Sequence, residues 1–174
     1  VEDRRVLFRG GLAYGLLVLL GLPFWIYWPV TVPRPELVVS DLFTWGIALT
    51  RWLDPPTNCF PSMHVAESYL AALVVARCNR RLGRGLLVMA TLIWWSTLAI
   101  GQHWFVDGLA GLVLALFADT LLFRLRPLPS SAFASGPVRR VGWIVLLYAV
   151  LFVGAALPWW MGLGLEGVVG AEAW

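Results

Sequence analysis

Five long runs of mostly apolar residues constrain this chain more than any other feature of its sequence. A helix needs about 20 such residues to cross the hydrocarbon core of a bilayer. Charged residues make up only 13% of the chain, about half the share typical of a soluble domain. The sequence therefore predicts an all-α integral membrane helical bundle that forms a single domain, 1–174. The predicted spans are 10–30, 61–77, 85–101, 105–123 and 141–163.

The segment 36–53 is predicted to be a further helix that lies in the membrane interface without crossing it. Its apolar residues recur at spacings of four and three, which is typical of one stripe along a helix. Asp41 and Arg51 interrupt the other faces, as expected of an amphipathic helix at a membrane surface. The stripe consists of Val38, Leu42, Trp45, Leu49 and Trp52.

The arginines predict the orientation, because cytoplasmic loops of membrane proteins are enriched in basic residues. All 13 basic residues are Arg, and with five spans only Arg34 and Arg51 fall on the outer side. If 36–53 crossed the membrane as a sixth span, the arginines of 77–84 would lie on the opposite side of the membrane from those of 4–9. The sequence thus predicts a cytoplasmic N-terminus in a plasma or inner membrane, and the net charge of +3 does not indicate nucleic acid. The inner arginines are Arg4, Arg5, Arg9, Arg77, Arg80, Arg81, Arg84, Arg124, Arg126, Arg139 and Arg140.

The chain has two histidines, His64 and His103, and they are predicted to meet at the outer end of the bundle. They lie 39 residues apart, enough for one helix down and one helix back. Asp107 follows His103 by four residues, on the same helical face. A carboxylate there can accept the Nδ1 proton and leave Nε2 as a nucleophile. Glu67 and Ser68 follow His64 at similar spacing, and ionisable side chains inside spans are usually functional.

Other interpretations of these side chains stay open on the residues alone. The histidines also fit ordinary polar residues of the interface. Together with Asp107 and Glu67 they offer zinc ligands, although the sequence lacks a close ligand pair such as H-E-x-x-H. Cys59 with His64 could form a nucleophile and its base. Cys59 and Cys78 are predicted at opposite membrane faces, where they cannot pair with each other, and each also fits as a small apolar filler.

Three motifs resemble those of the type 2 phosphatidic acid phosphatase superfamily. "PSMH" at 61–64 resembles the family's P-S-x-H motif. "STLAIGQHWFVD" at 96–107 resembles S-R-x5-H-x3-D, and "PRP" at 33–35 resembles the end of K-x6-R-P. The motifs occur in the family's order and cover residues 27–107, so together they are specific.

The resemblance implies a role for each polar residue. His103 would attack a lipid phosphate and form a phosphohistidine, Asp107 would orient it, and His64 would act as acid and then base. The implied donor is a phospholipid and the implied acceptor a lipid alcohol or water, with no metal and no other cofactor. The phosphate ligands would be Arg34, Arg51, Ser62, Ser96, Thr97 and Tyr27. The supporting residues would be Asn58, Glu67, Ser68 and Gln102.

Departures from the motifs favour one branch of the family. Tyr27 stands where the first motif has Lys, Thr97 where the third has Arg, and Met63 where the second often has Gly. A phosphomonoester carries about −1.5 to −2 charges near neutral pH, so a site with fewer cations suits a diester. Together with "FPSMHVA", these departures resemble the inositol phosphorylceramide synthase and sphingomyelin synthase branch, which moves phospho-headgroups between lipids. Arg51 could instead replace a lost cation and allow monoester hydrolysis.

Two further functions compete with lipid phosphoryl transfer. A non-catalytic membrane protein could bind lipid headgroups in the same pocket, although binding alone needs no oriented nucleophile. Vanadate-dependent haloperoxidases share these motifs but are soluble, which the predicted spans argue against. Away from the motifs, Asp119 is predicted to pair with a nearby arginine such as Arg124. Gly108, Gly111 and Ala115 form a small-residue face suited to close helix packing.

Overall fold

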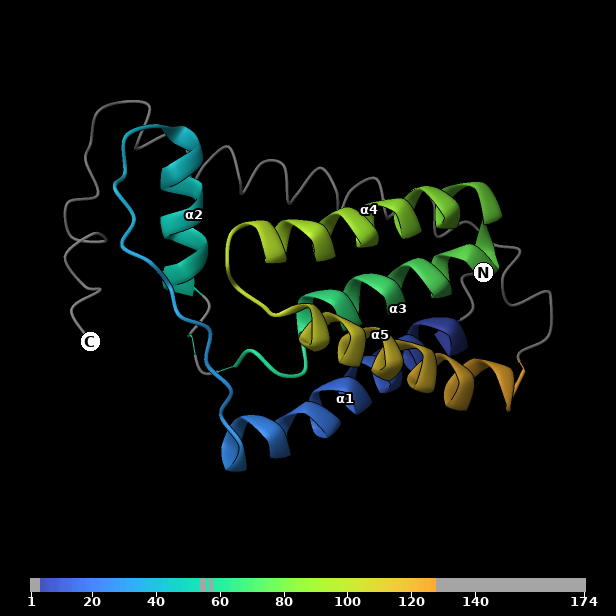
Figure 1. Cartoon of the computed structure of the whole chain (residues 1–174). Helices are drawn as coiled ribbons and strands as arrows, with labels where there is room; N and C mark the ends of the chain where they lie inside the picture. The colour runs from blue at the N-terminus through green and yellow to red at the C-terminus, as the bar shows by residue number, and fades with distance from the viewer. Residues whose placement is uncertain (1–3, 54–55, 57, 128–174) are drawn as a thin grey trace. The chain divides into compact units, whose positions relative to one another are not determined.

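The computed structural model describes residues 4–53, 56 and 58–127, and apart from one isolated β-bridge these residues form helices and their connections. The prediction of an all-α fold is therefore confirmed. The predicted span 141–163 lies outside the described residues. In chain order the elements are α1 (Arg4–Tyr27), α2 (Leu42–Leu53), α3 (Met63–Cys78), α4 (Arg80–Ala99), α5 (Phe105–Asp119) and the π-helix η1 (Thr120–Arg124) (Figure 1).

The chain divides into two compact units. The first comprises Val1–Pro33 and Pro56–Pro137 and so contains α1, α3, α4, α5 and η1, whereas α2 belongs to the second. Three helical stretches of the described residues are long and apolar enough to cross a membrane: Phe8–Tyr27, Arg80–Ala99 and Phe105–Arg124. These correspond to three of the predicted spans. The fourth, 61–77, forms α3, whose 16 residues rise about 24 Å, less than the roughly 30 Å hydrocarbon core.

Two tight turns make α3 and α5 run in the same direction, with α4 returning between them in the chain. Asn79 ends α3 and caps α4, because its side chain accepts hydrogen bonds from the amides of Arg81 and Leu82. Gly83 lies against the backbone of Ala76, where a Cβ atom would collide. After α4, Gly101 adopts a positive φ of 69°, a conformation that glycine tolerates best. Both turns therefore follow from the local sequence.

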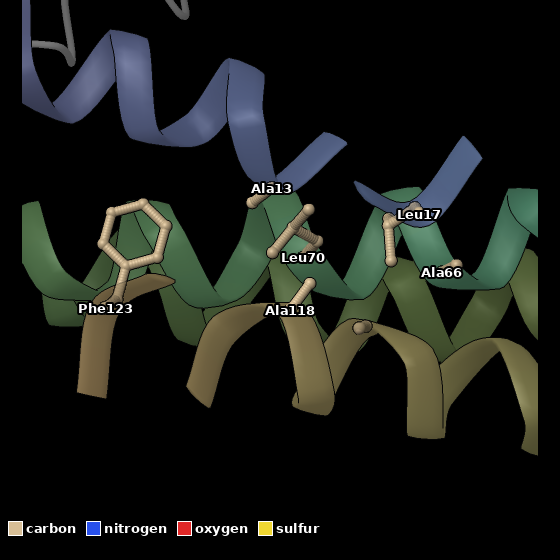
Figure 2. Close-up of a cluster of buried hydrophobic side chains, with 7 residues drawn as sticks. Ala13, Leu17, Ala66, Leu70, Ala118 and Phe123 are labelled. Carbon is tan, nitrogen blue, oxygen red and sulfur yellow. The ribbon is translucent and has the colours of Figure 1, made fainter. Parts of the chain in front are cut away.

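A buried apolar cluster, in which alanines pack between leucines and a phenylalanine, joins α1, α3, α5 and η1 (Figure 2). Small side chains allow the close backbone approach that stabilises helix pairs in membranes. Gly111 of α5 lies against the carbonyl oxygen of Ser62, where a side chain would collide. The predicted small-residue face of α5 is buried as expected. The cluster consists of Ala13, Leu17, Ala66, Leu70, Ala115, Ala118 and Phe123.

An ion-pair cluster around the buried side chain of Asp119 lies at one end of the first unit. Both Asp119 oxygens accept from Arg77 of α3, at 2.5 and 2.7 Å, and one also accepts from Arg124 at 3.1 Å. The predicted pairing of Asp119 with Arg124 is confirmed, and Arg77 is an additional partner. Arg9 joins α1 to the same end by donating to the carbonyls of Leu122 and Arg126.

The helix predicted at 36–53 begins later than its apolar stripe suggested. Residues 36–40 are not helical, and α2 starts at Leu42. Asp41 explains the boundary, since its carboxylate accepts from the amide of Thr44 at 2.8 Å and so caps the first turn. The Thr44 hydroxyl in return accepts from the amide of Asp41 at 3.1 Å. A strong local cap therefore overrides the stripe at Val38.

Candidate active site

The two histidines meet at the end of the first unit that lies opposite the Asp119 cluster. His64 lies in the first turn of α3, and His103 lies two residues before α5. Nδ1 of His64 is 3.3 Å from Nε2 of His103, and the rings are edge to face with centroids 5.5 Å apart. His103 is only 5% exposed, whereas the His64 side chain is exposed. The pair thus combines a buried imidazole with an accessible one.

Backbone hydrogen bonds hold both histidines in register. The amide of Ser62, just before α3, donates to the carbonyl of Asp107 at 3.0 Å and so ties the start of α3 to α5. The carbonyl of Thr97 accepts from the amides of Gln102 and His103, at 2.9 and 3.3 Å. These bonds fix the loop between α4 and α5 against the end of α4, so three helices position the site.

A backbone carbonyl sets the tautomer of His103. Its Nδ1 lies 2.8 Å from the carbonyl oxygen of Cys59. A carbonyl can only accept, so Nδ1 must carry the proton, and Nε2 of the neutral ring then has the lone pair. His64 Nδ1 must therefore be the donor in the contact between the two histidines. Nε2 of His103 therefore carries the lone pair and lies against His64.

The segment that supplies this carbonyl is anchored to the chain beyond α1. Val30 and Asn58 form a parallel β-bridge, and the amide of Cys59 donates to the carbonyl of Val30 at 3.3 Å. The thiol of Cys59 donates to the carbonyl of Pro56 at 3.0 Å. The thiol therefore bonds within its own loop, while the carbonyl faces His103. The sequence interpretation missed this carbonyl, because a backbone oxygen has no residue signature.

Asp107 lies beside His103 but does not take the position expected of it. Its Oδ2 is 3.6 Å from Nδ1 of His103, which is too long for a hydrogen bond. The same oxygen accepts from the amide of Trp104 at 2.8 Å. Asp107 is the third residue of α5, a position from which acidic side chains commonly reach back to cap a helix. Its influence on His103 is therefore electrostatic, with both side chains buried.

Several buried polar atoms have no hydrogen-bond partner among the described residues. They include Oγ of Ser62, Nε2 of Gln102, Nε1 of Trp94 and Oδ1 of Asp107. Leaving such a group unpaired costs about 1–3 kcal/mol, so these atoms have hydrogen-bonding capacity for a ligand. Trp94 was not predicted from the sequence, and its indole lies against Gly108, where a side chain would collide with it.

Comparison with known families agrees with the motifs. The family model described as the PAP2 superfamily matches residues 10–131, well over half of the chain. The chain belongs to the PAP2 superfamily. Members of this family are generally lipid phosphatases or phosphotransferases, and with three helices able to span a bilayer the protein is an integral membrane protein.

One curated relative of this PAP2 protein belongs to the branch that the sequence interpretation favoured. It is the inositol phosphorylceramide synthase catalytic subunit AUR1 of Saccharomyces cerevisiae, 36% identical over 58 residues. The match covers 33% of this chain and 14% of the relative, so the chain spans only a small part of that protein. No solved structure matches the chain.

Three of the predicted phosphate ligands, Ser96, Thr97 and Tyr27, form no described hydrogen bond to the histidine pair. The Thr97 hydroxyl donates to the carbonyl of Trp94 and the Ser96 hydroxyl to that of Ile93, both at 2.8 Å within their own helix. Serine and threonine often bond back to a helix carbonyl in this way. Tyr27, at the end of α1, is 80% exposed.

The two predicted cationic ligands, Arg34 and Arg51, lie in the second unit, where each guanidinium donates to a backbone carbonyl. Arg34 donates to the carbonyl of Arg51 at 3.1 Å, and Arg51 donates to that of Pro35 at 2.8 Å. His64 and His103 belong to the first unit.

The residues predicted to support the site have mixed positions. Gln102 is buried beside His103, and Asn58 lies in the β-bridge. The Ser68 hydroxyl donates to the carbonyl of His64 at 2.5 Å, which reinforces the first turn of α3. Glu67 is half-buried one turn after His64.

Proposed function

We propose that this PAP2 protein transfers a phosphate or phospho-headgroup from a phospholipid to an acceptor alcohol through a phosphohistidine at His103. The observation that carries the proposal is the 3.3 Å contact between His64 Nδ1 and His103 Nε2, combined with the carbonyl that holds the proton on the other nitrogen of His103. This geometry presents a lone pair next to a second imidazole that can move protons.

The chemistry proceeds in two displacements. Nε2 of His103 attacks phosphorus, the bond to the leaving oxygen breaks, and protonated His64 gives that oxygen its proton. Neutral His64 then takes the proton of the acceptor hydroxyl, whose oxygen attacks phosphorus as the bond to Nε2 breaks. Because 3.3 Å between the nitrogens leaves no room for a phosphoryl group, the exposed His64 side chain must swing aside when substrate binds.

Charge stabilisation comes from groups that surround His103. The imidazole becomes positive once Nε2 binds phosphorus, and the Asp107 carboxylate, 3.6 Å from Nδ1, favours that charge. Ser62 and Gln102, which lie next to the histidines in the chain, offer buried donors without partners among the described residues, which suit phosphate oxygens. Phosphoryl transfer depends mainly on such positioning and electrostatics.

The missing cations favour headgroup transfer over monoester hydrolysis. Tyr27 and Thr97 replace the Lys and Arg of the family motifs, and neither is cationic. A diester has one negative charge to neutralise, fewer than a monoester. The curated yeast relative is named as an inositol phosphorylceramide synthase subunit, which supports the same choice. Hydrolysis of a lipid monophosphate, with water as the acceptor, is the second candidate.

The site is proposed to face away from the cytoplasm. The histidines lie at one end of the first unit, and Arg9, Arg77 and Arg124 gather at the other. Since basic residues favour the cytoplasmic side, the histidine end is the extracytoplasmic one. Lipid headgroups of the outer leaflet would reach it directly.

The proposal is tested with purified protein in lipid micelles. Radiolabelled phosphatidic acid and phosphatidylinositol serve as donors, with ceramide or diacylglycerol as acceptor and His103→Ala as the control. Label in a new lipid supports transfer, and free phosphate from phosphatidic acid supports the hydrolase. If neither donor reacts, or if His103→Ala reacts as fast as the wild type, the proposed chemistry is wrong.

A further inference from the structure

Trp94 of α4 is a half-buried tryptophan that contacts two neighbouring helices. Its ring meets Tyr69 of α3 edge to face, with centroids 6.5 Å apart, and stacks on Phe105 of α5, with centroids 5.1 Å apart. The indole also lies against Gly108 of α5, where a Cβ atom would collide with it. One side chain of α4 therefore packs against both α3 and α5.

The contacts that Trp94 makes on α5 bracket Asp107 in the chain. Phe105 comes two residues before Asp107, and Gly108 follows it directly. Phe105 and Gly108 are three residues apart and so lie on one face of α5. The α5 backbone is held from α3 as well, because the carbonyl of Asp107 accepts from the amide of Ser62 at 3.0 Å. Contacts on two sides thus fix how α5 is rotated about its axis, and with it the direction of the Asp107 side chain.

His103 is held by other parts of the chain. Its amide donates to the carbonyl of Thr97 near the end of α4, at 3.3 Å, and its Nδ1 donates to the carbonyl of Cys59 at 2.8 Å. Oδ2 of Asp107 and Nδ1 of His103 are 3.6 Å apart, too far for a hydrogen bond to fix their separation. That separation therefore depends on where α5 lies relative to α4, and the Trp94 ring packs between these two helices.

We propose that Trp94 is a positioning residue that sets the distance between the Asp107 carboxylate and the His103 ring. It acts through its packing on Phe105 and Gly108. The inference rests on the proposed function, in which the carboxylate stabilises the charge that His103 gains during phosphoryl transfer. A side chain larger than that of Gly108 would push α5 away from the indole. A residue smaller than tryptophan would leave a void into which α5 could shift.

Trp94 and Trp95 provide a matched pair of variants. They are neighbours on α4, but Trp95 is 71% exposed, whereas Trp94 packs on Phe105 and Gly108. Trp94→Leu removes the ring that lies between the helices, and Trp95→Leu removes the same volume from the surface. Trp94→Phe is a milder change, because it keeps a ring to stack on Phe105 and loses the pyrrole edge that meets Gly108.

The test is an NMR titration of the His103 ring, which does not depend on turnover. The titratable groups that face this ring are His64 and Asp107. A His64→Gln background removes the first of them and leaves His103 as the only histidine of the chain, so protein with 15N-labelled histidine gives one set of ring signals. The protein is studied in detergent micelles, and thermal unfolding of each variant is the folding control.

The Asp107 carboxylate favours the charged ring, so moving it away lowers the pH at the midpoint of the His103 titration. A retreat from 3.6 Å to about 6 Å would lower this midpoint by about one pH unit at an effective dielectric constant near 20. We expect that shift for Trp94→Leu, a smaller one in the same direction for Trp94→Phe, and none for Trp95→Leu. In an Asp107→Asn background, Trp94→Leu should cause no further shift, because the charge through which it acts is gone.

Three results would overturn the inference: a midpoint that Trp94→Leu leaves unchanged, an equal shift for Trp95→Leu, or a shift of the same size in the Asp107→Asn background. The last would mean that Trp94 acts on His103 by a route other than Asp107. If Trp94→Leu does not fold, Trp94→Phe is judged by the same comparison against Trp95→Phe. The expected shifts in a protein whose wild type turns over neither donor lipid would contradict only the proposed function.

Discussion

Replacing Asp107 by Asn removes one negative charge beside His103 and keeps the shape of the side chain. The carboxylate lies 3.6 Å from Nδ1 of His103. At an effective dielectric constant near 20, a full charge on the ring would interact with it by about 4–5 kcal/mol. The ring gains this charge when Nε2 binds phosphorus. Since the amide dipole and nearby solvent retain part of the effect, we expect kcat to fall about 10²–10³-fold.

The same substitution should leave the fold intact. The Asn oxygen can still accept from the amide of Trp104, as Asp107 does at 2.8 Å, so α5 keeps its cap. The Cys59 carbonyl, 2.8 Å from Nδ1, keeps His103 in the same tautomer. The variant therefore tests charge stabilisation by Asp107 separately from orientation of the His103 ring, because the Cys59 carbonyl still orients the ring when the charge is removed.

The assay compares initial rates of the wild type and Asp107→Asn over a range of donor lipid in mixed micelles. Thermal unfolding of each protein serves as the folding control. We expect a lower kcat with KM changed little, because the charge develops only as the reaction proceeds. A kcat within threefold of the wild type would refute the electrostatic role, and a large loss of thermal stability would refute the assignment of the cap.

Three further predictions test other parts of the structure. Asp119→Asn should lower the unfolding temperature by weakening both arginine contacts, while kcat of the folded protein stays the same; a selective loss of kcat would contradict this structural role. A membrane-impermeant thiol reagent should spare Cys59, which is 1% exposed, and label Cys78 only after the inner face is opened; labelling of Cys78 in intact cells would invert the topology. Hydrogen bonds from the Thr44 amide and hydroxyl hold the pKa of Asp41 below its ordinary value, so this cap stabilises α2 above the unfolded pKa and is lost as the pH falls through the folded pKa. The NMR shift of the Thr44 amide should follow that loss, and the Asp41→Asn variant should show none.

Several features of the site could be predicted because they depend on length and periodicity. Two antiparallel helices that each cross the bilayer need about as many residues as separate His64 from His103. The length of this segment therefore predicts that the two histidines lie at the same end of the bundle. The short separation of Asp107 from His103 in the chain similarly keeps the two close, although His103 precedes α5 and the expected helical spacing does not apply to it. A buried Asp119 needs a basic partner. The motifs added the order of the three segments, which identifies the family.

Other features depended on the path of the backbone. The hydroxyls of Ser96 and Thr97 stand at motif positions, yet both bond to carbonyls of their own helix. Such a choice between a ligand and the local backbone is decided by side-chain rotamers, which the residue type leaves open. The late start of α2 similarly reflects a cap at Asp41 that competes with the apolar stripe.

By itself, the sequence determined the helical membrane class, the pairing of two histidines and the family chemistry to expect. Only the tertiary structure decided that a carbonyl of Cys59 orients His103 and that Trp94 lies against Gly108. The reason is physical. Hydrophobic runs and helical spacing are properties of one segment, whereas a carbonyl direction or a contact between helices arises where several segments pack, and no single segment encodes it.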